Sequence, residues 1–137
     1  MLNKPTDHIV KSFDEDLKRL NNVIAEMGGL AEAQLTRAVE SLVRRNSELA
    51  AQVVQDDKRI DNLETDVGQL TVRMLALRQP MAQDLREVVA AIKIASDIER
   101  IGDHATNVAE IVYYLAHGRS LDEERPKGDT TNVPIDA

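Results

Sequence analysis

The chain has 137 residues, of which 42% are apolar and only 2% aromatic, so one core of almost entirely aliphatic side chains is expected. It contains no cysteine, which excludes disulfides, thiolate metal ligands and cysteine nucleophiles. Its formal net charge of −7 argues against a nucleic-acid-binding function, because such proteins present a basic face to phosphates.

The first predicted element is a long amphipathic helix over residues 6–45. Its apolar side chains recur at spacings of three and four from Ile9 to Leu42. Gly28 and Gly29 interrupt this pattern, and a glycine inside a helix costs about 1 kcal/mol relative to alanine. We therefore expect either a kink or a close helix contact at the two glycines.

The second predicted helix begins after an N-cap at Asn46-Ser47 and ends at Gln79-Pro80. Only Asp56 interrupts its apolar stripe, and it is either a buried polar residue that sets specificity or an inward-facing ligand. The residue before a proline is biased away from helix, whereas proline suits the first turn of the next helix. A third helix is therefore expected over about residues 81–116, with Gly118 as its C-cap.

Three long helices with short connections predict an all-α fold, an antiparallel three-helix bundle over residues 6–117. The apolar stripe of the third helix is expected at these positions: Ile94, Ile98, Ile101, Ala105, Val108, Val112 and Leu115. Residues 118–137 are polar and lack periodicity, which predicts a linker or disordered tail. The extra faces of such a bundle leave room for a second bundle, from another copy or from a missing part of the chain.

Two acidic pairs flank the apolar stripes of the second and third helices. Asp57 and Asp61 are four residues apart, as are Glu99 and Asp103, so each pair lies on one helix face. In an antiparallel hairpin that turns near residues 79–80, Asp61 lies at the height of Glu99. By the same count Asp57 lies at the height of Asp103. Both pairs turn toward the same side, so we expect the four carboxylates to converge.

Carboxylates brought together in this way repel one another unless a cation binds between them. Two unit charges about 4 Å apart interact by about 4 kcal/mol at an effective dielectric near 20. Oxygen-only ligands suit magnesium, calcium or manganese, and iron can also bind them. Three neighbouring polar residues could support such a site: Glu64, Asn107 and Glu110.

The alternative is that these acidic residues are the solvated rows that flank many helical seams. Lys58 and Arg100 lie at helical spacing to pair with them. His104 follows Asp103 but points about 100° away around the helix. No glutamate is followed three residues later by histidine, the motif of di-metal carboxylate enzymes in helical bundles, so we expect no enzyme and no catalytic residue.

Several motifs resemble the PhoU family of phosphate-uptake regulators. The run Glu99-Arg-Ile-Gly-Asp103, followed by Ala105-x-Asn107-Val-Ala-Glu110, resembles the family signature. Asp57-Lys-Arg-Ile-Asp61 is similar to its first acidic motif, and residues 78–86 resemble its hairpin between the second and third helices. The resemblance extends over residues 8–125, with the motifs in the family's order.

The resemblance implies a three-helix bundle whose acidic pairs bind divalent or trivalent metal ions, with iron, manganese or magnesium in a multinuclear cluster. The metal ligands that it implies are Asp57, Asp61, Glu99 and Asp103. The implied role is non-enzymatic. The resemblance implies that the chain is a negative regulator of the phosphate-starvation response that links the phosphate ABC transporter to a sensor histidine kinase. The alternative function is a metal-free, coiled-coil-like scaffold or oligomerisation module.

Localisation and assembly follow from the same features. The amino terminus has no apolar signal region, and no apolar run approaches the roughly 20 residues that span a bilayer. We expect a cytoplasmic protein without membrane insertion, and peripheral association stays open. PhoU proteins usually carry two bundles, whereas this chain has a single Glu-Arg-Ile-Gly-Asp motif, which predicts a fragment or a homodimer.

Overall fold

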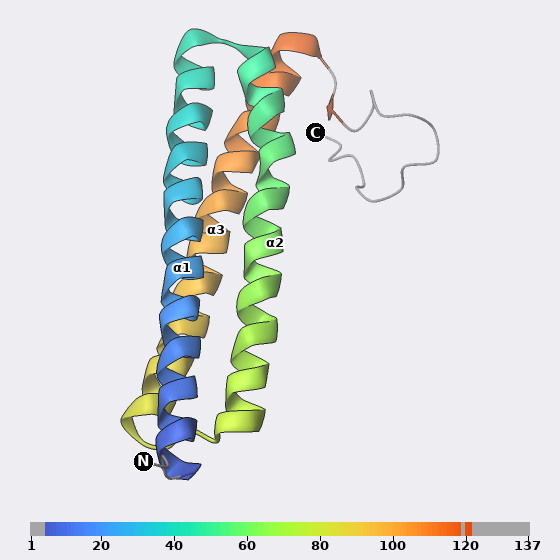
Figure 1. Ribbon diagram of the computed structural model, residues 1–137. Helices are drawn as coiled ribbons and strands as arrows, with labels where there is room; N and C mark the ends of the chain where they lie inside the picture. The colour runs from blue at the N-terminus through green and yellow to red at the C-terminus, as the bar shows by residue number, and fades with distance from the viewer. Residues whose placement is uncertain (1–4, 119, 122–137) are drawn as a thin grey trace, which may run out of the picture. The chain divides into compact units, whose positions relative to one another are not determined.

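Three long helices form the framework of the protein. The computed structural model describes residues 5–118 and 120–121, with side chains from Ser12 onward. Helix α1 spans Pro5–Arg44, α2 spans Ser47–Arg78 and α3 spans Gln83–His117 (Figure 1). The predicted all-α fold, an antiparallel three-helix bundle, is confirmed. The predicted tail lies outside the described residues except at positions 118, 120 and 121.

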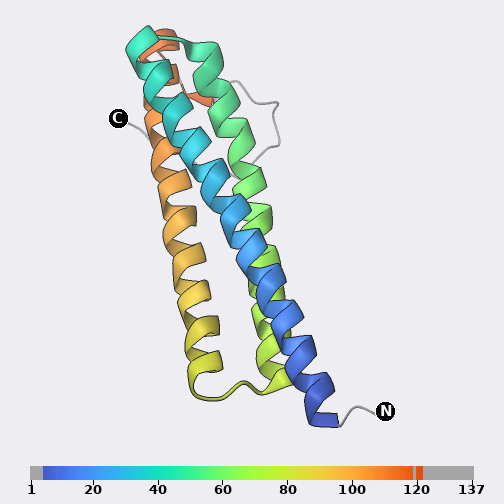
Figure 2. The ribbon, with the colours of Figure 1, turned by 60° about the vertical axis from the view of Figure 1, so that its left-hand side comes forward.

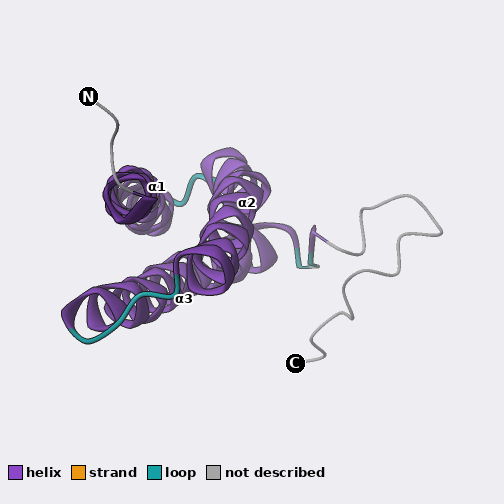
Figure 3. Cartoon of the chain, turned by 60° about the horizontal axis from the view of Figure 1, so that its bottom comes forward, coloured by secondary structure: helices purple, strands orange, loops and turns teal. Residues whose placement is uncertain are grey.

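Short connections separate the helices (Figure 3), and each contains residues with left-handed backbone. Arg45 has φ of 53°, and the Leu49 N–H then donates to Asn46 Oδ1 at 3.1 Å, so Asn46 caps α2 as expected. Gln79 and Ala82 also have positive φ, 47° and 52°. Helix α3 consequently begins two residues later than predicted, and Pro80 lies in the connection.

Gly118 ends α3 in the predicted way. Its φ is 69°, in the left-handed region that glycine adopts without steric cost. Its N–H donates to the Tyr114 carbonyl at 2.7 Å, which satisfies one of the carbonyls at the end of the helix. Among the described residues, no helix is long and apolar enough to cross a membrane.

The helices contribute to two compact units. Unit 1 combines Met1–Leu30 with Arg59–Arg100, and unit 2 combines Ala31–Lys58 with Ile101–Ala137. Each unit therefore contains a segment of α1, α2 and α3. Consecutive helices run in opposite directions, as their short connections require (Figure 2).

Each unit has its own aliphatic core. The core of unit 1 includes the fully buried side chains Leu20, Met27, Ile60, Met74 and Val88. The core of unit 2 consists mainly of small residues, namely Ala38, Ala50, Val53, Ala105, Ala109, Val112 and Tyr113. Small side chains let helices approach closely, so unit 2 packs its helices through an alanine-rich contact.

The buried row of α3 differs from the predicted stripe. Ile94, Ile101 and Leu115 are 49%, 43% and 73% exposed, although all three were expected in the core. Ala105 and Val112 of the predicted stripe are buried, and Ala91, Ala95 and Ala109, which lie outside it, are buried with them. Two adjacent rows of α3 are apolar and share one period, so periodicity could not show which row packs inside. The row with smaller side chains does.

Gly28 and Gly29 produce neither an interruption of α1 nor a contact that requires glycine. Helix α1 is continuous from Pro5 to Arg44. A Cβ on Gly28 would lie 3.9 Å from Cδ1 of Ile98, an ordinary van der Waals distance, and a Cβ on Gly29 would meet nothing within 4 Å. Either glycine could therefore carry a methyl group.

Candidate metal centre

In unit 2, α2 and α3 each contribute one acidic residue to a common position. Asp57 and Asp103 are both half-buried, and each offers a carboxylate oxygen within 4.8 Å of the other. The sequence predicts that these two residues lie at the same height in an antiparallel hairpin of α2 and α3. Their shared position follows from the antiparallel course of α2 and α3 on either side of the turn at residues 79–82.

In unit 1, three acidic residues gather in the same way. Asp61 and Glu64 of α2 and Glu99 of α3 offer oxygens that all lie within 4.8 Å of one another. Asp61 is exposed, whereas Glu64 and Glu99 are half-buried. The pairing of Asp61 with Glu99 is the one that the sequence count predicts.

Glu64 is the member of this group that the sequence reasoning placed only in a supporting position. The signal for it was present, because Glu64 follows Asp61 by three residues and a spacing of three lies on the same helix face. The other two supporting candidates, Asn107 and Glu110, belong to neither acidic group, and Asn107 is exposed. His104 is also exposed and outside both groups.

The acidic residues follow one another at helical spacing. Asp57 and Asp61 are one turn apart on α2, and Glu99 and Asp103 are one turn apart on α3. Each helix therefore presents its acidic side chains along a single face.

The donor set determines which ions could bind. All five side chains offer carboxylate oxygens, and no thiol exists in the chain. Like charges less than 5 Å apart repel by about 1 kcal/mol in water and about 4 kcal/mol at an effective dielectric of 20. A cation bound between them removes this repulsion. Oxygen-only donors suit magnesium, calcium, manganese and iron ions.

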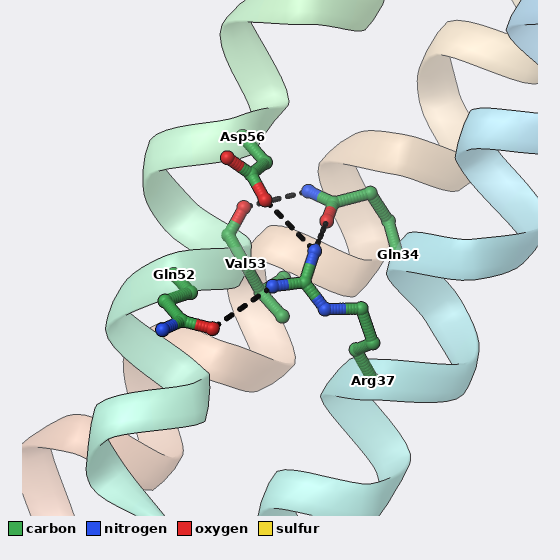
Figure 4. A network of polar contacts seen from close by, with 5 residues as sticks. All are labelled: Gln34, Arg37, Gln52, Val53 and Asp56. Atoms are coloured by element: carbon green, nitrogen blue, oxygen red, sulfur yellow. Dashed lines mark hydrogen bonds and ion pairs between the residues drawn. The ribbon is translucent and has the colours of Figure 1, made fainter.

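Asp56 has a different role from its neighbour Asp57. Arg37 of α1 donates from Nη1 to Asp56 Oδ2 at 2.8 Å and from Nη2 to Gln52 Oε1 at 3.3 Å (Figure 4). Gln34 donates to the Val53 carbonyl at 2.6 Å. Asp56 thus belongs to a polar contact between α1 and α2. The Asp56 side chain is partly exposed and lies outside both acidic groups, so it matches neither of the two roles expected from the sequence.

One residue step on α2 separates these two roles. A step of one residue rotates a side chain by about 100° around the helix. Asp56 consequently pairs with Arg37 of α1, whereas Asp57 lies beside Asp103 of α3. The ion pair is partly exposed, with 30% of the Arg37 side chain and 43% of the Asp56 side chain accessible.

Comparison with known proteins places these features in a family. The family model described as PhoU domain matches residues 24–112, which include both acidic groups. A phosphate-specific transport system accessory protein PhoU homolog from Zymomonas mobilis is 50% identical over 114 residues, covering 83% of this chain and 48% of that protein. The homolog of the same name from Xylella fastidiosa is 50% identical over 103 residues, covering 75% and 42%.

A solved structure shows the same fold. The crystal structure of PhoU from Pseudomonas aeruginosa matches with a TM-score of 0.74 at 39% identity, covering 77% of this chain and 51% of that chain. The present chain spans about half the length of the curated relatives that it matches.

Proposed function

Because this chain belongs to the PhoU family, we propose that it is an accessory and regulatory component of a phosphate transport system. In this proposal it is a non-enzymatic, cytoplasmic negative regulator of the phosphate-starvation response. Its partners are the phosphate ABC transporter and a sensor histidine kinase. It acts as a homodimer without inserting into the membrane. Support comes from the family membership and from the names of the relatives, which describe accessory proteins.

The second part of the proposal is that the acidic residues bind metal ions. The proposed ligands are Asp57, Asp61, Glu99 and Asp103, joined by Glu64. The observation that carries this part is the meeting of Asp57 with Asp103 in unit 2 and of Asp61 with Glu64 and Glu99 in unit 1. The donor chemistry fits a hard cation, and iron, manganese and magnesium are the candidates.

When bound, such an ion would supply positive charge between the carboxylates of α2 and α3. The other contributions come from residues of the protein. The half-buried Asp57 and Asp103 fix the distance between donors on the two helices. The ion pair with Arg37 holds Asp56, the residue before Asp57, toward α1. A bound ion would therefore link the two helices.

Metal analysis with a matched pair of variants tests the ligand assignment. Purified protein is loaded with manganese or iron, desalted and analysed by elemental analysis, and manganese binding is titrated calorimetrically. We expect stoichiometric metal in the wild type and at least a tenfold loss of affinity in Asp57→Asn/Asp103→Asn. Asp56→Asn removes the neighbouring carboxylate of the same helix turn and should retain the metal.

Two outcomes would contradict the assignment. If the wild type binds no manganese, iron or magnesium, the metal site fails and a metal-free scaffold function takes its place. If Asp56→Asn loses as much metal as the double variant, the loss reflects damage to α2 and not the removal of ligands.

Gene replacement tests the regulatory role. We expect cells that lack this protein to express a phosphate-starvation reporter even when phosphate is plentiful. Wild-type protein should restore repression, whereas Asp57→Asn/Asp103→Asn should restore it poorly at equal protein level. A reporter that stays silent in the deletion strain contradicts the negative-regulator role, whatever the metal content of the protein.

A further inference from the structure

Thr106 of α3 has a buried hydroxyl group that finds no hydrogen-bond partner among the described residues. Its Oγ1 is shielded from solvent, although the residue as a whole is half-buried. Two threonines of α2 show a common arrangement inside a helix, donation to the carbonyl four residues earlier. Thr71 Oγ1 donates to the Val67 carbonyl at 2.8 Å, and Thr65 Oγ1 donates to the Asp61 carbonyl at 3.1 Å. Thr106 makes no such bond.

The buried hydroxyl of Thr106 is unfavourable as long as nothing bonds to it. Burial removes the water molecules that would bond to its oxygen, and no group of the described chain replaces them. The flanking buried residues of α3, Ala105 and Ala109, are apolar, so the hydroxyl stands alone on this part of the buried surface. Buried polar groups in folded proteins usually bond to protein, water or an ion. A bound ion beside Thr106 would satisfy the hydroxyl oxygen.

Thr106 lies on the face of α3 that carries Asp103. The two residues are three apart, a spacing that places side chains on one helix face. At a rise of 1.5 Å per residue, their Cα atoms are separated by about 4.5 Å along the helix axis. Asp103 in turn meets Asp57 of α2, with carboxylate oxygens within 4.8 Å of each other. Thr106 is therefore the next residue along α3 on the side where the two unit 2 carboxylates meet.

The opposite directions of α2 and α3 make the side chains of Asp57 and Thr106 lean toward each other. Every Cα–Cβ bond of a helix tilts toward the amino terminus of that helix. Thr106 therefore leans toward the level of Asp103, which is also the level of Asp57. Equal counting from the turn near residues 79–80 places Thr106 at the height of Val54, and Asp57 leans toward that height. Both side chains thus extend into the interval between the two levels.

The chemistry of a hydroxyl suits the ion that the carboxylates would hold. Oδ1 of Asp57 is shielded from solvent, as is Oγ1 of Thr106, so both helices offer a shielded oxygen in unit 2. Threonine and serine hydroxyls are established ligands of magnesium, as in the phosphate-binding loop of many nucleotide-hydrolysing proteins. A hydroxyl is neutral, so it adds an oxygen donor without adding to the repulsion between Asp57 and Asp103.

We propose that the Thr106 hydroxyl is a neutral oxygen ligand of the ion that Asp57 and Asp103 hold in unit 2. This inference rests on the metal binding of the proposed function and adds a ligand that no acidic spacing indicates. It also gives the buried hydroxyl a partner in the metal-bound protein. Thr106 then stabilises the protein only when the ion is present, and this dependence separates a ligand from a residue that merely packs.

Calorimetric titration of the full 137-residue chain with manganese tests the ligand. Valine has nearly the shape of threonine but carries a methyl group in place of the hydroxyl. We expect Thr106→Val to weaken manganese binding at least tenfold, whereas Thr106→Ser keeps the hydroxyl and should bind within threefold of the wild type. In the Asp57→Asn/Asp103→Asn variant, where the unit 2 ion is already lost, Thr106→Val should cause no further loss.

Thermal denaturation of the same variants gives a second readout. In a chelator, Thr106→Val should melt at or above the temperature of the wild type, because a methyl group replaces a hydroxyl that has no partner. In excess manganese the order should reverse, with the wild type melting at the higher temperature. A residue that only packs would change the melting temperature by the same amount in both conditions.

Thr71→Val is the matched control, because Thr71 is a buried threonine of α2 whose hydroxyl already bonds to the Val67 carbonyl. It should leave manganese affinity unchanged. If Thr106→Val binds manganese as tightly as the wild type, or Thr106→Ser binds as weakly as Thr106→Val, the inference is overturned and the assignment of Asp57 and Asp103 stands. A wild type that binds no manganese, iron or magnesium overturns the proposed metal site and this inference together.

Discussion

At the scale of single residues, Asp56 and Asp57 show how adjacent, chemically identical side chains acquire separate roles. Asp56 forms an ion pair with Arg37, and this pair joins α1 to α2 together with the hydrogen bond from Gln34 to Val53. Asp57 lies beside Asp103, and two carboxylates at this separation are expected to repel each other when no cation is bound. Opposite effects on stability are therefore expected when each carboxylate is neutralised.

Asp56→Asn should destabilise the protein. We expect the free energy of unfolding to fall by about 1 kcal/mol, since the ion pair is short but partly exposed. Urea denaturation followed by circular dichroism measures the change. Glu40→Gln is the control, because it breaks a more exposed 3.3 Å ion pair with Arg44 and should change stability by less than about 0.5 kcal/mol. Equal effects of the two substitutions would show that the Arg37 network contributes nothing special.

Asp103→Asn should stabilise the protein when no metal is present. Removing one of two carboxylates whose oxygens lie within 4.8 Å relieves repulsion, and we expect a gain of up to about 1 kcal/mol at low salt because both groups are half-buried. Denaturation in the presence of a chelator measures it. The gain should shrink at 1 M salt, where charges are screened over about 3 Å. A loss of stability would contradict the expected repulsion.

At the scale of the helices, local chemistry sets the ends and tertiary packing sets the buried face. Asn46 begins α2 through the hydrogen bond that its side chain accepts, and Gly118 ends α3 in a left-handed backbone conformation that glycine adopts without steric cost. The glycine pair of α1 shows the reverse case. A residue type that disfavours helix is tolerated because the surrounding segment of α1 is held by its buried face.

Gly29→Ala should raise stability. Gly29 lies inside α1 with open space around it, so alanine adds helix propensity without a clash. We expect the free energy of unfolding to increase by about 1 kcal/mol. Thermal and urea denaturation measure the gain. Unchanged or reduced stability would indicate that the backbone at Gly29 needs a conformation that alanine resists.

Asn46→Ala should lower stability through the end of α2. The side chain of Asn46 accepts a hydrogen bond from the Leu49 N–H at 3.1 Å, and alanine leaves that donor without it. We expect a loss of about 1 kcal/mol. Asn46→Ser keeps an acceptor at the same place and should recover most of the stability. If serine and alanine behave alike, the cap does not contribute.

At the scale of the whole molecule, the proposed metal centre couples binding to folding. An ion that binds only the folded state stabilises it by about 2.7 kcal/mol at a concentration one hundred times its dissociation constant. We expect excess manganese to raise the melting temperature by several degrees and a chelator to reverse this. Asp57→Asn/Asp103→Asn should show a smaller shift, because it removes the ligands of unit 2 and leaves Asp61, Glu64 and Glu99 in place, and an equal shift in that variant would place the stabilising ion away from Asp57 and Asp103.

The three helices and the two acidic pairs could be predicted from the sequence. The helices depend on apolar periodicity, and the pairs depend on the number of residues between each acidic side chain and the turn. Helix lengths follow from apolar spacings of three and four. Counting residues in both directions from the turn near residues 79–80 places Asp57 at the height of Asp103 and Asp61 at the height of Glu99. The binding of metal by these residues stays a prediction. The structure adds that the carboxylate of Glu64, three residues after Asp61, lies within 4.8 Å of those of Asp61 and Glu99.

The sequence by itself determined that three helices form, where they begin and end to within about two residues, and which acidic residues share a height. Only the tertiary structure decided which of two adjacent apolar rows of α3 is buried, because both rows satisfy the same helical period and only contact with α1 and α2 distinguishes them. It also decided that Asp56 pairs with Arg37, since a partner on another helix, 19 residues earlier, has no signature in local spacing.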